Sequence, residues 1–145
     1  MDNYFEIHVM KLNPSPFEKI VSGRKTIELR LYDDKRRKID IGDRIIFKNL
    51  DNQEKEIAVK VTSLHRYLTF EDLFRSIPLE KCGNDAKETP EDAAAGMKKY
   101  YSDDQIKRYG VLGIEIELDN LEFVQKRLEE HKEAAFDHWF PDGMK

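Results

Sequence analysis

The sequence predicts an α+β fold: a small, mostly antiparallel β-barrel of about five strands, with helices inserted between strands and a further C-terminal helix. Five segments rich in β-type apolar residues alternate with polar turns. Residues that favour helix N-caps precede several short segments whose apolar residues recur at helical spacing. The length of 145 residues suits one domain and leaves little room for two.

The first two predicted elements are a strand over residues 4–10 and a short helix. We expect Phe5, Ile7 and Val9 to share one face of the strand, opposite Glu6, His8 and Met10. Ser15 is the expected helix cap, with Pro16 at the first helical position and Glu18 completing a capping box. Gly23 is expected to end the helix, because glycine adopts a left-handed turn without steric cost.

The second predicted strand, residues 25–31, carries the most informative polar side chains. Alternation places Glu28, Arg30 and Tyr32 on one face, opposite Ile27 and Leu29. Lys25 begins on the opposite face from Glu28, so it joins them only if the chain is irregular after Gly23.

The remaining elements follow from turns, caps and stripes. Strands are expected at 44–50, 54–64 and 111–118, and helices open at Thr69, Thr89 and Ser102. Asp119 is expected to cap the C-terminal helix, whose stripe is Leu121, Val124 and Leu128. This stripe needs a surface to cover, either on the body or on a partner. The tail, with Phe136, Trp139 and Phe140, is expected to dock on the body.

The charge is distributed unevenly. The chain has a formal net charge of -4, which disfavours generic coating of nucleic acid through phosphates. Residues 19–38, however, hold eight basic and three acidic side chains, a net of +5, so the rest of the chain carries -9. This asymmetry indicates a local anion-attracting region. The alternative is that residues 33–38 form a solvated turn.

Several classes of function are excluded or disfavoured. One cysteine, Cys82, allows no intrachain disulfide and no cysteine-based zinc site, and the histidines show no metal-ligand spacing, so we predict no metal and no cofactor. No apolar run reaches membrane-spanning length, and the N-terminus lacks signal-peptide features. A cytoplasmic location is the resulting expectation.

The segment PFEKIVSGRKTIELRLYDDKRRKIDIGDRIIF, residues 16–47, resembles the ASCH domain, a family related in fold to the PUA domain. The resemblance rests on Gly23, Lys25, Glu28 and Arg30 in fixed order after an apolar helix, and on a Gly42-Asp43 pair before a strand. The late YGVLGIEIE resembles the closing strand of the family. We therefore expect an ASCH domain at residues 1–118, with residues 119–145 as a helix and tail packed on it.

The resemblance implies a PUA-like barrel with a cleft beside the first helix, and an interaction with RNA. Some bacterial relatives are amidohydrolases that deacylate N4-acetylcytidine, and others have been linked to RNA cleavage, so a nucleoside amidohydrolase and an RNA hydrolase are the enzyme activities that the resemblance implies. Lys25 matches the lysine of the amidohydrolases. Their motif has a threonine three residues later, where this sequence has Glu28. That departure weakens transfer of the reaction.

Chemistry suggests roles for the cleft residues. Lys25 and Glu28 are the candidate catalytic residues, because a desolvated lysine can act as a base or nucleophile. Arg30 is the main candidate ligand contact, since arginine grips phosphates or base edges with two bonds. The alternative is that Glu28 and Arg30 form an ion pair that stabilises the strand and that Lys25 is a surface lysine.

Three further residues are predicted to contact the ligand: His8, Arg24 and Tyr32. A structural role fits the position of His8 equally well, so both roles stay open. Among five tyrosines that could stack on bases, Tyr32 is preferred because it shares a strand face with Arg30; the others are Tyr67, Tyr100, Tyr101 and Tyr109.

Three functions follow, in order. The first is recognition of RNA, a nucleotide or a small anionic ligand in the cleft of Lys25, Glu28 and Arg30. The second is an amidohydrolase acting on a modified nucleoside. The third is a protein-interaction domain, or a homodimer, that uses the C-terminal helix.

Overall fold

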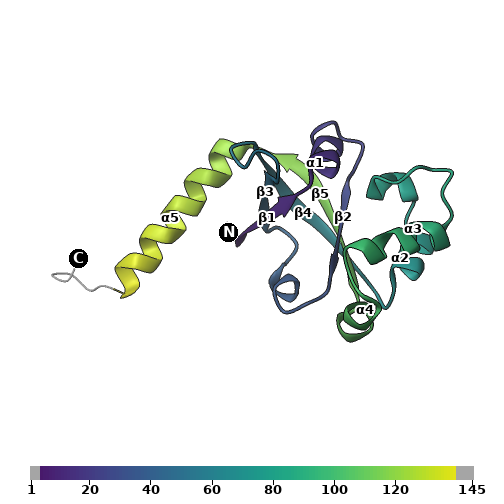
Figure 1. The fold of residues 1–145 in the computed structure, drawn as a ribbon. Helices are drawn as coiled ribbons and strands as arrows, with labels where there is room; N and C mark the ends of the chain where they lie inside the picture. Colours follow the sequence, from purple (N-terminus) through teal and green to yellow (C-terminus); the bar gives the residue numbers. More distant parts are fainter. Residues whose placement is uncertain (1–3, 140–145) are drawn as a thin grey trace.

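A curled five-stranded sheet lies at the centre of the structure, a computed structural model that describes the backbone of residues 4–139 and the side chains of residues 4–133 (Figure 1). The strands are β1 (Ile7–Leu12), β2 (Ile27–Leu31), β3 (Arg44–Asn49), β4 (Glu56–Tyr67) and β5 (Val111–Asp119). Their order in the sheet is β1-β3-β4-β5-β2. The β1–β3 pair is parallel and the other three pairs are antiparallel. This mixed half-barrel confirms the predicted α+β class.

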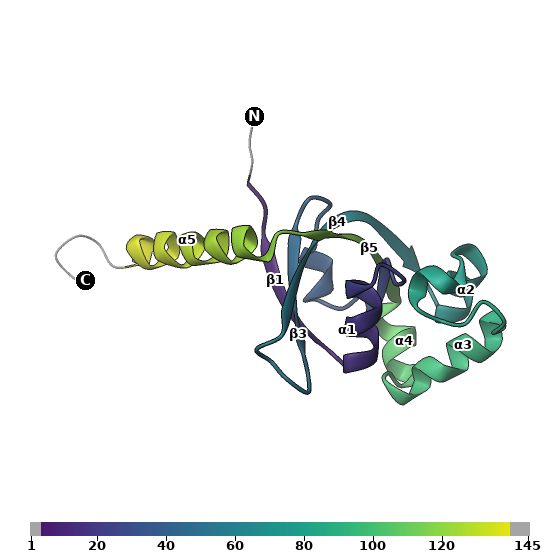
Figure 2. The ribbon, with the colours of Figure 1, turned by 90° about the horizontal axis from the view of Figure 1, so that it is seen from above.

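Five α-helices surround the sheet in the described part of the chain: α1 (Pro14–Val21), α2 (Phe70–Ser76), α3 (Pro90–Gly96), α4 (Asp103–Tyr109) and α5 (Leu121–Trp139). Short 3-10 turns are η1 (Arg36–Lys38), η2 (Leu79–Cys82) and η3 (Met97–Lys99). Helices α2 to α4 gather at one end of the sheet, and α5 leaves from the other end (Figure 2). None of the helices within residues 4–139 combines the length and apolarity that a membrane span requires.

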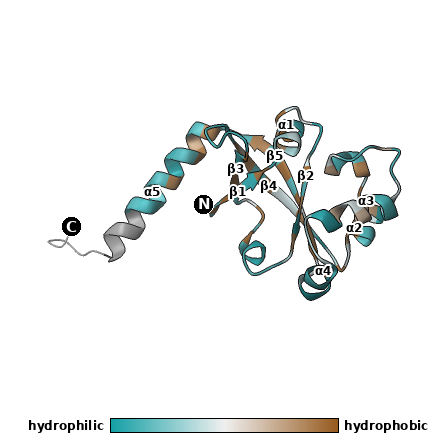
Figure 3. Cartoon of the chain, in the orientation of Figure 1, coloured by the Kyte–Doolittle hydropathy of each residue, from teal (hydrophilic) through white to brown (hydrophobic). Residues whose placement is uncertain are grey.

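Strand β2 lies between two apolar clusters of the core. Ile27, Leu29 and Leu31 pack with α2, α3 and α4 on one side. The other cluster fills the inside of the curl, around Phe47 and Leu112. The strands are rich in apolar residues, while the connecting turns are largely hydrophilic (Figure 3). The polar residues of β2 therefore emerge between two cores, at an edge of the sheet.

Two predicted features of the first helix need correction. Helix α1 begins at Pro14, with Asn13 rather than Ser15 as the cap, and the Asn13 side chain makes no capping hydrogen bond. Proline favours the first helical positions because its φ angle is already helical, so Pro14 starts the helix before Ser15 is reached. Gly23 does follow the helix with a φ of 81°, as predicted.

Strand β1 turns Met10 and Leu12 to the inner core and not the face of Ile7 and Val9, although Phe5, just before the strand, is itself buried. Met10 and Leu12 are buried in the inner core, whereas Val9 is 38% exposed. Strand β1 starts only at Ile7, and it lies at the edge of the sheet beside β3. The register with β3 decides which face is inward, and a local apolar pattern that occurs on both faces does not fix that register.

The C-terminal helix packs on the sheet through its first turns. Val124 is fully buried against Ile46 and Ala58, with Leu121 and Leu128 partly buried beside it. The predicted stripe is therefore covered by the chain itself. The cap is Asn120, whose side chain accepts from the Phe123 amide, and not Asp119. The predicted docking of the tail concerns side chains outside those that the structure describes.

Candidate functional site

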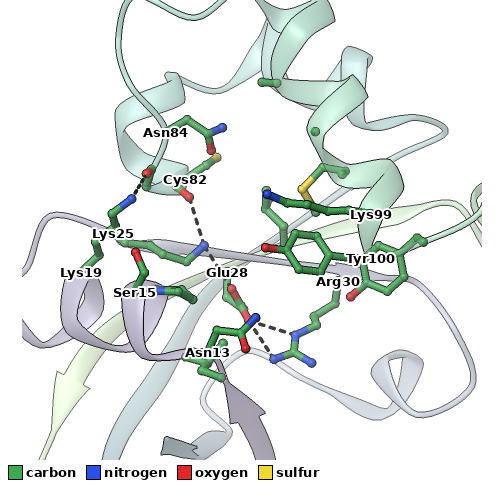
Figure 4. Close-up of a pocket in the computed structure, with 18 of the residues that line it drawn as sticks. Asn13, Ser15, Lys19, Lys25, Glu28, Arg30, Cys82, Asn84, Lys99 and Tyr100 are labelled. Carbon is green, nitrogen blue, oxygen red and sulfur yellow. Dashed lines mark hydrogen bonds and ion pairs between the residues drawn. The ribbon is translucent and has the colours of Figure 1, made fainter. Parts of the chain in front are cut away.

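A pocket of about 690 Å³ opens between α1, β2 and the segment that runs from η2 to η3 (Figure 4). Lys25, Glu28 and Arg30 all line it. Asn13, Ser15 and Lys19 line it from the α1 side, and Cys82, Asn84, Lys99, Tyr100 and Tyr101 from the opposite side. The structure thus brings the three central predicted residues into one hollow.

The chain after α1 explains how Lys25 reaches Glu28. The Lys25 amide donates to the Lys19 carbonyl at 3.0 Å, and the Thr26 amide donates to the Lys81 carbonyl at 2.9 Å. Strand β2 starts only at Ile27. The prediction that the strand begins at residue 25 is therefore wrong. Strand alternation does not apply before Ile27, so Lys25 is free to lie on the same side as Glu28.

Glu28 links the two cations. Its Oε1 lies 3.1 Å from Lys25 Nζ, and its Oε2 lies 2.9 Å from both Nε and Nη2 of Arg30. Glu28 and Lys25 are buried, with 4% and 6% of their surface exposed. A buried carboxylate requires compensation by charge and hydrogen bonds, and here two cations supply both. The predicted ion pair of Glu28 and Arg30 is therefore present, within a larger cluster.

The balance of effects keeps Glu28 ionised. Burial acts to raise the pKa of Glu28, but the charges of Lys25 and Arg30 and their hydrogen bonds act together to hold this pKa below its usual value. Glu28 is consequently a fixed negative charge at neutral pH. It orients Lys25 and Arg30, and it is unsuited to donate a proton as a general acid.

Both cations keep donors that the protein leaves unused. Lys25 Nζ donates to the Cys82 carbonyl at 3.0 Å and contacts Glu28, which uses two of its three N–H bonds. Arg30 uses Nε and Nη2, the latter also donating to the Lys11 carbonyl at 2.9 Å. Among the described residues, Arg30 Nη1 has no partner. The pocket therefore presents one ammonium and one guanidinium donor on either side of a buried carboxylate.

The η2 turn forms the wall against which Lys25 packs. Its last residue is followed by Gly83, which has a φ of 86°, and Lys19 Nζ donates to the Gly83 carbonyl at 2.8 Å. A Cβ at Gly83 would lie 3.1 Å from Lys25 Cδ. Two independent reasons therefore favour glycine at position 83: its positive φ, and the side chains of Lys25 and Lys19 that pack close to it. No local pattern predicts this packing, because Cys82 at the end of η2 is 57 residues from Lys25.

Two of the five candidate tyrosines line the pocket, Tyr100 and Tyr101. Tyr101 stacks on Phe70 with ring centroids 6.0 Å apart, and burial raises the pKa of its hydroxyl. Tyr100 is 54% exposed, and Lys99 lies over its ring. An aromatic surface therefore faces the cations of β2 across the pocket. The run Lys99-Tyr100-Tyr101 is the sequence signal for it.

The other three predicted ligand contacts lie elsewhere. His8 Nε2 pairs with Asp43 at 2.8 Å, and Asp43 also accepts from the Glu6 and Asp40 amides, so His8 belongs to a structural network. Arg24 is exposed and bonds Ser22. Tyr32 is flanked by two guanidiniums, Arg37 and Arg66. None of the three lines the pocket. Arg24 is next to Lys25 in sequence and Tyr32 is two residues from Arg30, but their side chains contact Ser22 and the two arginines instead of the pocket.

Cys82 contributes through its backbone. Its carbonyl accepts from Lys25, while its thiol is buried, with a pKa raised to about 11 by desolvation. In the described residues, His, Cys, Asp and Glu side chains form no group of three or more that could hold a metal ion.

These features define a class: an α+β half-barrel with a polar pocket at the edge where α1 meets β2. The family profile described as ASCH domain matches residues 10–119. The chain belongs to the ASCH domain family. A comparison with curated protein sequences gives no significant match.

Solved structures agree with this fold. The chain is 32% identical to hypothetical protein PH0355, with a TM-score of 0.68, covering 78% of this chain and 99% of the other. It is 31% identical to protein PF0455 from Pyrococcus furiosus, with a TM-score of 0.61 and coverage of 77% and 96%. A mutant of ZmASCH from Zymomonas mobilis is 16% identical, with a TM-score of 0.50 and coverage of 83% and 78%, and supports the fold alone.

Proposed function

We propose that this protein recognises a short RNA or a nucleotide-like ligand in the pocket of Lys25, Glu28 and Arg30. The family has a PUA-like fold that is often associated with RNA binding. The observation that carries the proposal is the buried Lys25–Glu28–Arg30 cluster, whose two cations keep N–H donors free of protein partners among the described residues. Such donors suit the oxygen atoms of a phosphate or of a base carbonyl.

The charge of the lining supports an anionic or strongly polar ligand. Five cationic side chains line the pocket, against three carboxylates: Lys11, Lys19, Lys25, Arg30 and Lys99, with Glu28, Asp85 and Glu88. This local surplus contrasts with the net charge of -4 for the chain. A concave site focuses such a field and raises the local concentration of oppositely charged ligands.

Aromatic side chains supply the second kind of contact that nucleotides use. Tyr101 is fixed by Phe70, and Tyr100 lies beside it at the pocket. Stacking of one base on an aromatic ring contributes about 1–3 kcal/mol. Cations on one wall and tyrosines on the other match the phosphate and the base of one nucleotide.

The geometry favours recognition over hydrolysis. A nucleophilic lysine acts as the neutral amine, whereas the contact of Lys25 with the ionised Glu28 is an ion pair of the ammonium form. Glu28 also stands where the amidohydrolase motif has threonine. We therefore treat turnover of a modified nucleoside as an outcome that would displace the proposal.

Calorimetric titration tests the proposal. The probes are the four nucleoside monophosphates and a mixed-sequence single-stranded RNA pentamer. Wild-type protein should bind at least one probe, and Lys25→Met and Arg30→Met should each weaken binding at least tenfold. Lys126→Met, at an exposed position on α5, is the matched control and should bind as wild type does.

Thermal unfolding of each variant separates loss of binding from loss of fold. Absence of binding by the wild-type protein to every probe would refute the proposal. Incubation with N4-acetylcytidine, followed by chromatography, covers the alternative: turnover that disappears in Lys25→Met would assign an amidohydrolase instead.

A further inference from the structure

A second group of cations lies beyond the pocket, where β2 continues into η1. Lys35, Arg37 and Lys38 of this connection are exposed, and Arg66 near the end of β4 is exposed beside them. We call these four residues the η1 patch. In the described part of the chain, no carboxylate forms a salt bridge with any of the four.

The ring of Tyr32 holds two of these cations together. The guanidinium carbon of Arg66 lies 4.0 Å from the ring centroid, and that of Arg37 lies 5.0 Å from it. The Arg37 side chain also donates to the Tyr32 carbonyl at 3.3 Å. Contact with an aromatic face occupies the face of a guanidinium and leaves its in-plane N–H donors available. Two like charges fixed beside one ring are repulsive unless an anion compensates them.

The patch follows the pocket along the chain, where the segment after β2 runs into η1. Arg30, which lines the pocket, precedes Tyr32 by two residues on the same strand edge. Arg36 belongs to the same η1 turn as Arg37 and Lys38 of the patch. Arg36 Nη1 pairs with Asp33, but its buried Nε has no hydrogen-bond partner in the described structure. Buried donors without partners are rare in folded proteins.

From this arrangement we infer that the ligand is a single-stranded oligonucleotide, with one nucleotide in the pocket and its neighbouring phosphates on the η1 patch. The inference rests on the proposed function of the pocket. A mononucleotide gives no role to unpaired cations outside the pocket, whereas a strand that continues past Arg30 places phosphates over Arg37 and Arg66 of the η1 patch. Figure 3 shows the turn between β2 and β3 in the colour of hydrophilic residues.

An acidic peptide is the competing occupant of such a patch. The observations favour the oligonucleotide, because the cations continue directly from a pocket that has tyrosines for a base. Phosphates also suit arginine, whose donors match their oxygens in pairs. The two occupants are distinguished by including a pentaglutamate peptide among the probes.

The test compares the pentamer with the monophosphates on the full chain. The double variant R37Q/R66Q should bind the pentamer roughly tenfold more weakly than wild type, because about two phosphate contacts are removed. It should bind the best monophosphate within twofold of wild type. The slope of log K against log salt for the pentamer should fall in magnitude by about 1.4, which is about 0.7 per contact.

Two controls make the comparison specific. K126Q/K132Q removes the same charge from exposed positions on α5 and should bind the pentamer as wild type does, apart from a small general loss. R37K/R66K keeps the charges and should keep most of the salt dependence, and it guards against a defect in the packing around Tyr32.

Three results would overturn the inference while leaving the pocket proposal intact. One is a wild-type protein that binds the pentamer no more tightly than a monophosphate. Another is an R37Q/R66Q variant that binds the pentamer as K126Q/K132Q does, or that loses monophosphate binding equally. The third is a pentaglutamate peptide that binds as tightly as the pentamer and depends on the same arginines. Failure of the wild-type protein to bind any nucleotide or RNA would overturn both.

Discussion

The Arg30 guanidinium on β2 donates to the Lys11 carbonyl on β1 at 2.9 Å, and so joins the two edge strands of the sheet. These strands are not paired with each other by backbone hydrogen bonds. The same guanidinium compensates the buried Glu28. One side chain therefore connects the closure of the half-barrel to the geometry of the pocket.

The first prediction concerns this connection. Arg30→Met should lower the free energy of unfolding by about 1–3 kcal/mol, because it leaves polar groups without their partner. Arg30→Lys should recover only part of this loss, since one ammonium cannot reproduce the guanidinium contacts to Glu28 and Lys11. Urea unfolding measures both. Equal stability of Arg30→Met and wild type would show that the bridge does not hold the sheet.

The second prediction concerns the coupling of Lys25 and Glu28. Lys25→Met should destabilise the protein by about 3–5 kcal/mol, because removal of one partner leaves a buried charge poorly compensated. The double variant Lys25→Met/Glu28→Gln should be less destabilised than the sum of the two single variants. A double-mutant cycle by urea unfolding gives this coupling energy. Strict additivity would indicate that the two residues act independently.

The third prediction concerns acid. The pKa of Glu28 is lower in the folded state than its ordinary value of 4.5, so the unfolded chain binds a proton more readily below that pH. The stability from Glu28 is therefore complete above about pH 4.5 and declines as the pH falls through the folded pKa. Unfolding curves measured at several pH values between neutral pH and pH 3 should show a larger loss in the free energy of unfolding for wild type than for Glu28→Gln.

Asp119 requires a control in that experiment, because hydrogen bonds and the charge of Arg44 also lower its pKa against a raising effect of burial. Asp119→Asn removes this second contribution. The difference in the free energy of unfolding between Asp119→Asn and Asp119→Asn/Glu28→Gln should still increase as the pH is raised toward neutral. A difference that is constant with pH would contradict the assignment to Glu28.

The fourth prediction separates backbone strain from contact with Lys25. Gly83 and Gly42 have φ values of 86° and 96°, so alanine at either position should cost about 1–2 kcal/mol for the left-handed conformation. Only at Gly83 would the new Cβ contact Lys25, at 3.1 Å, whereas nothing lies within 4 Å at Gly42. Gly83→Ala should therefore weaken nucleotide binding, and Gly42→Ala should not. Calorimetry on both variants decides this, and equal affinities would argue against a role of Gly83 in positioning Lys25.

The fifth prediction concerns the Cys82 thiol. It is 3% exposed and its pKa is raised to about 11, so little thiolate exists at neutral pH. Native protein should react with an aromatic disulfide reagent at least a hundredfold more slowly than unfolded protein does. About 6 M guanidinium unfolds most domains and supplies the unfolded reference. Rapid labelling of the native protein would show that η2 opens readily.

Much of the fold followed from local signals, because those signals act over a few residues. The caps at Thr69, Thr89 and Ser102 are present as predicted, each with its side chain accepting from the expected backbone amide. Glu28 and Arg30 share a side of β2 because strand alternation is a local property. The first cap was wrongly predicted at Ser15 because Pro14 already starts the helix. Which side of β1 packs on the inner core depends on its register with β3, which no local pattern fixes.

The sequence by itself determined the ASCH family and the shared side of Glu28 and Arg30 on β2, because both depend on neighbouring positions along the chain. The position of Lys25 beside them depends on contacts with the distant η2 turn. Only the tertiary structure decided what surrounds them: the Cys82 carbonyl, Gly83 and the tyrosines arrive from distant segments, and His8 and Tyr32 turn away. The physical reason is that long-range packing and sheet curvature set these contacts, and neither is encoded by the spacing of residues in a strand or a helix.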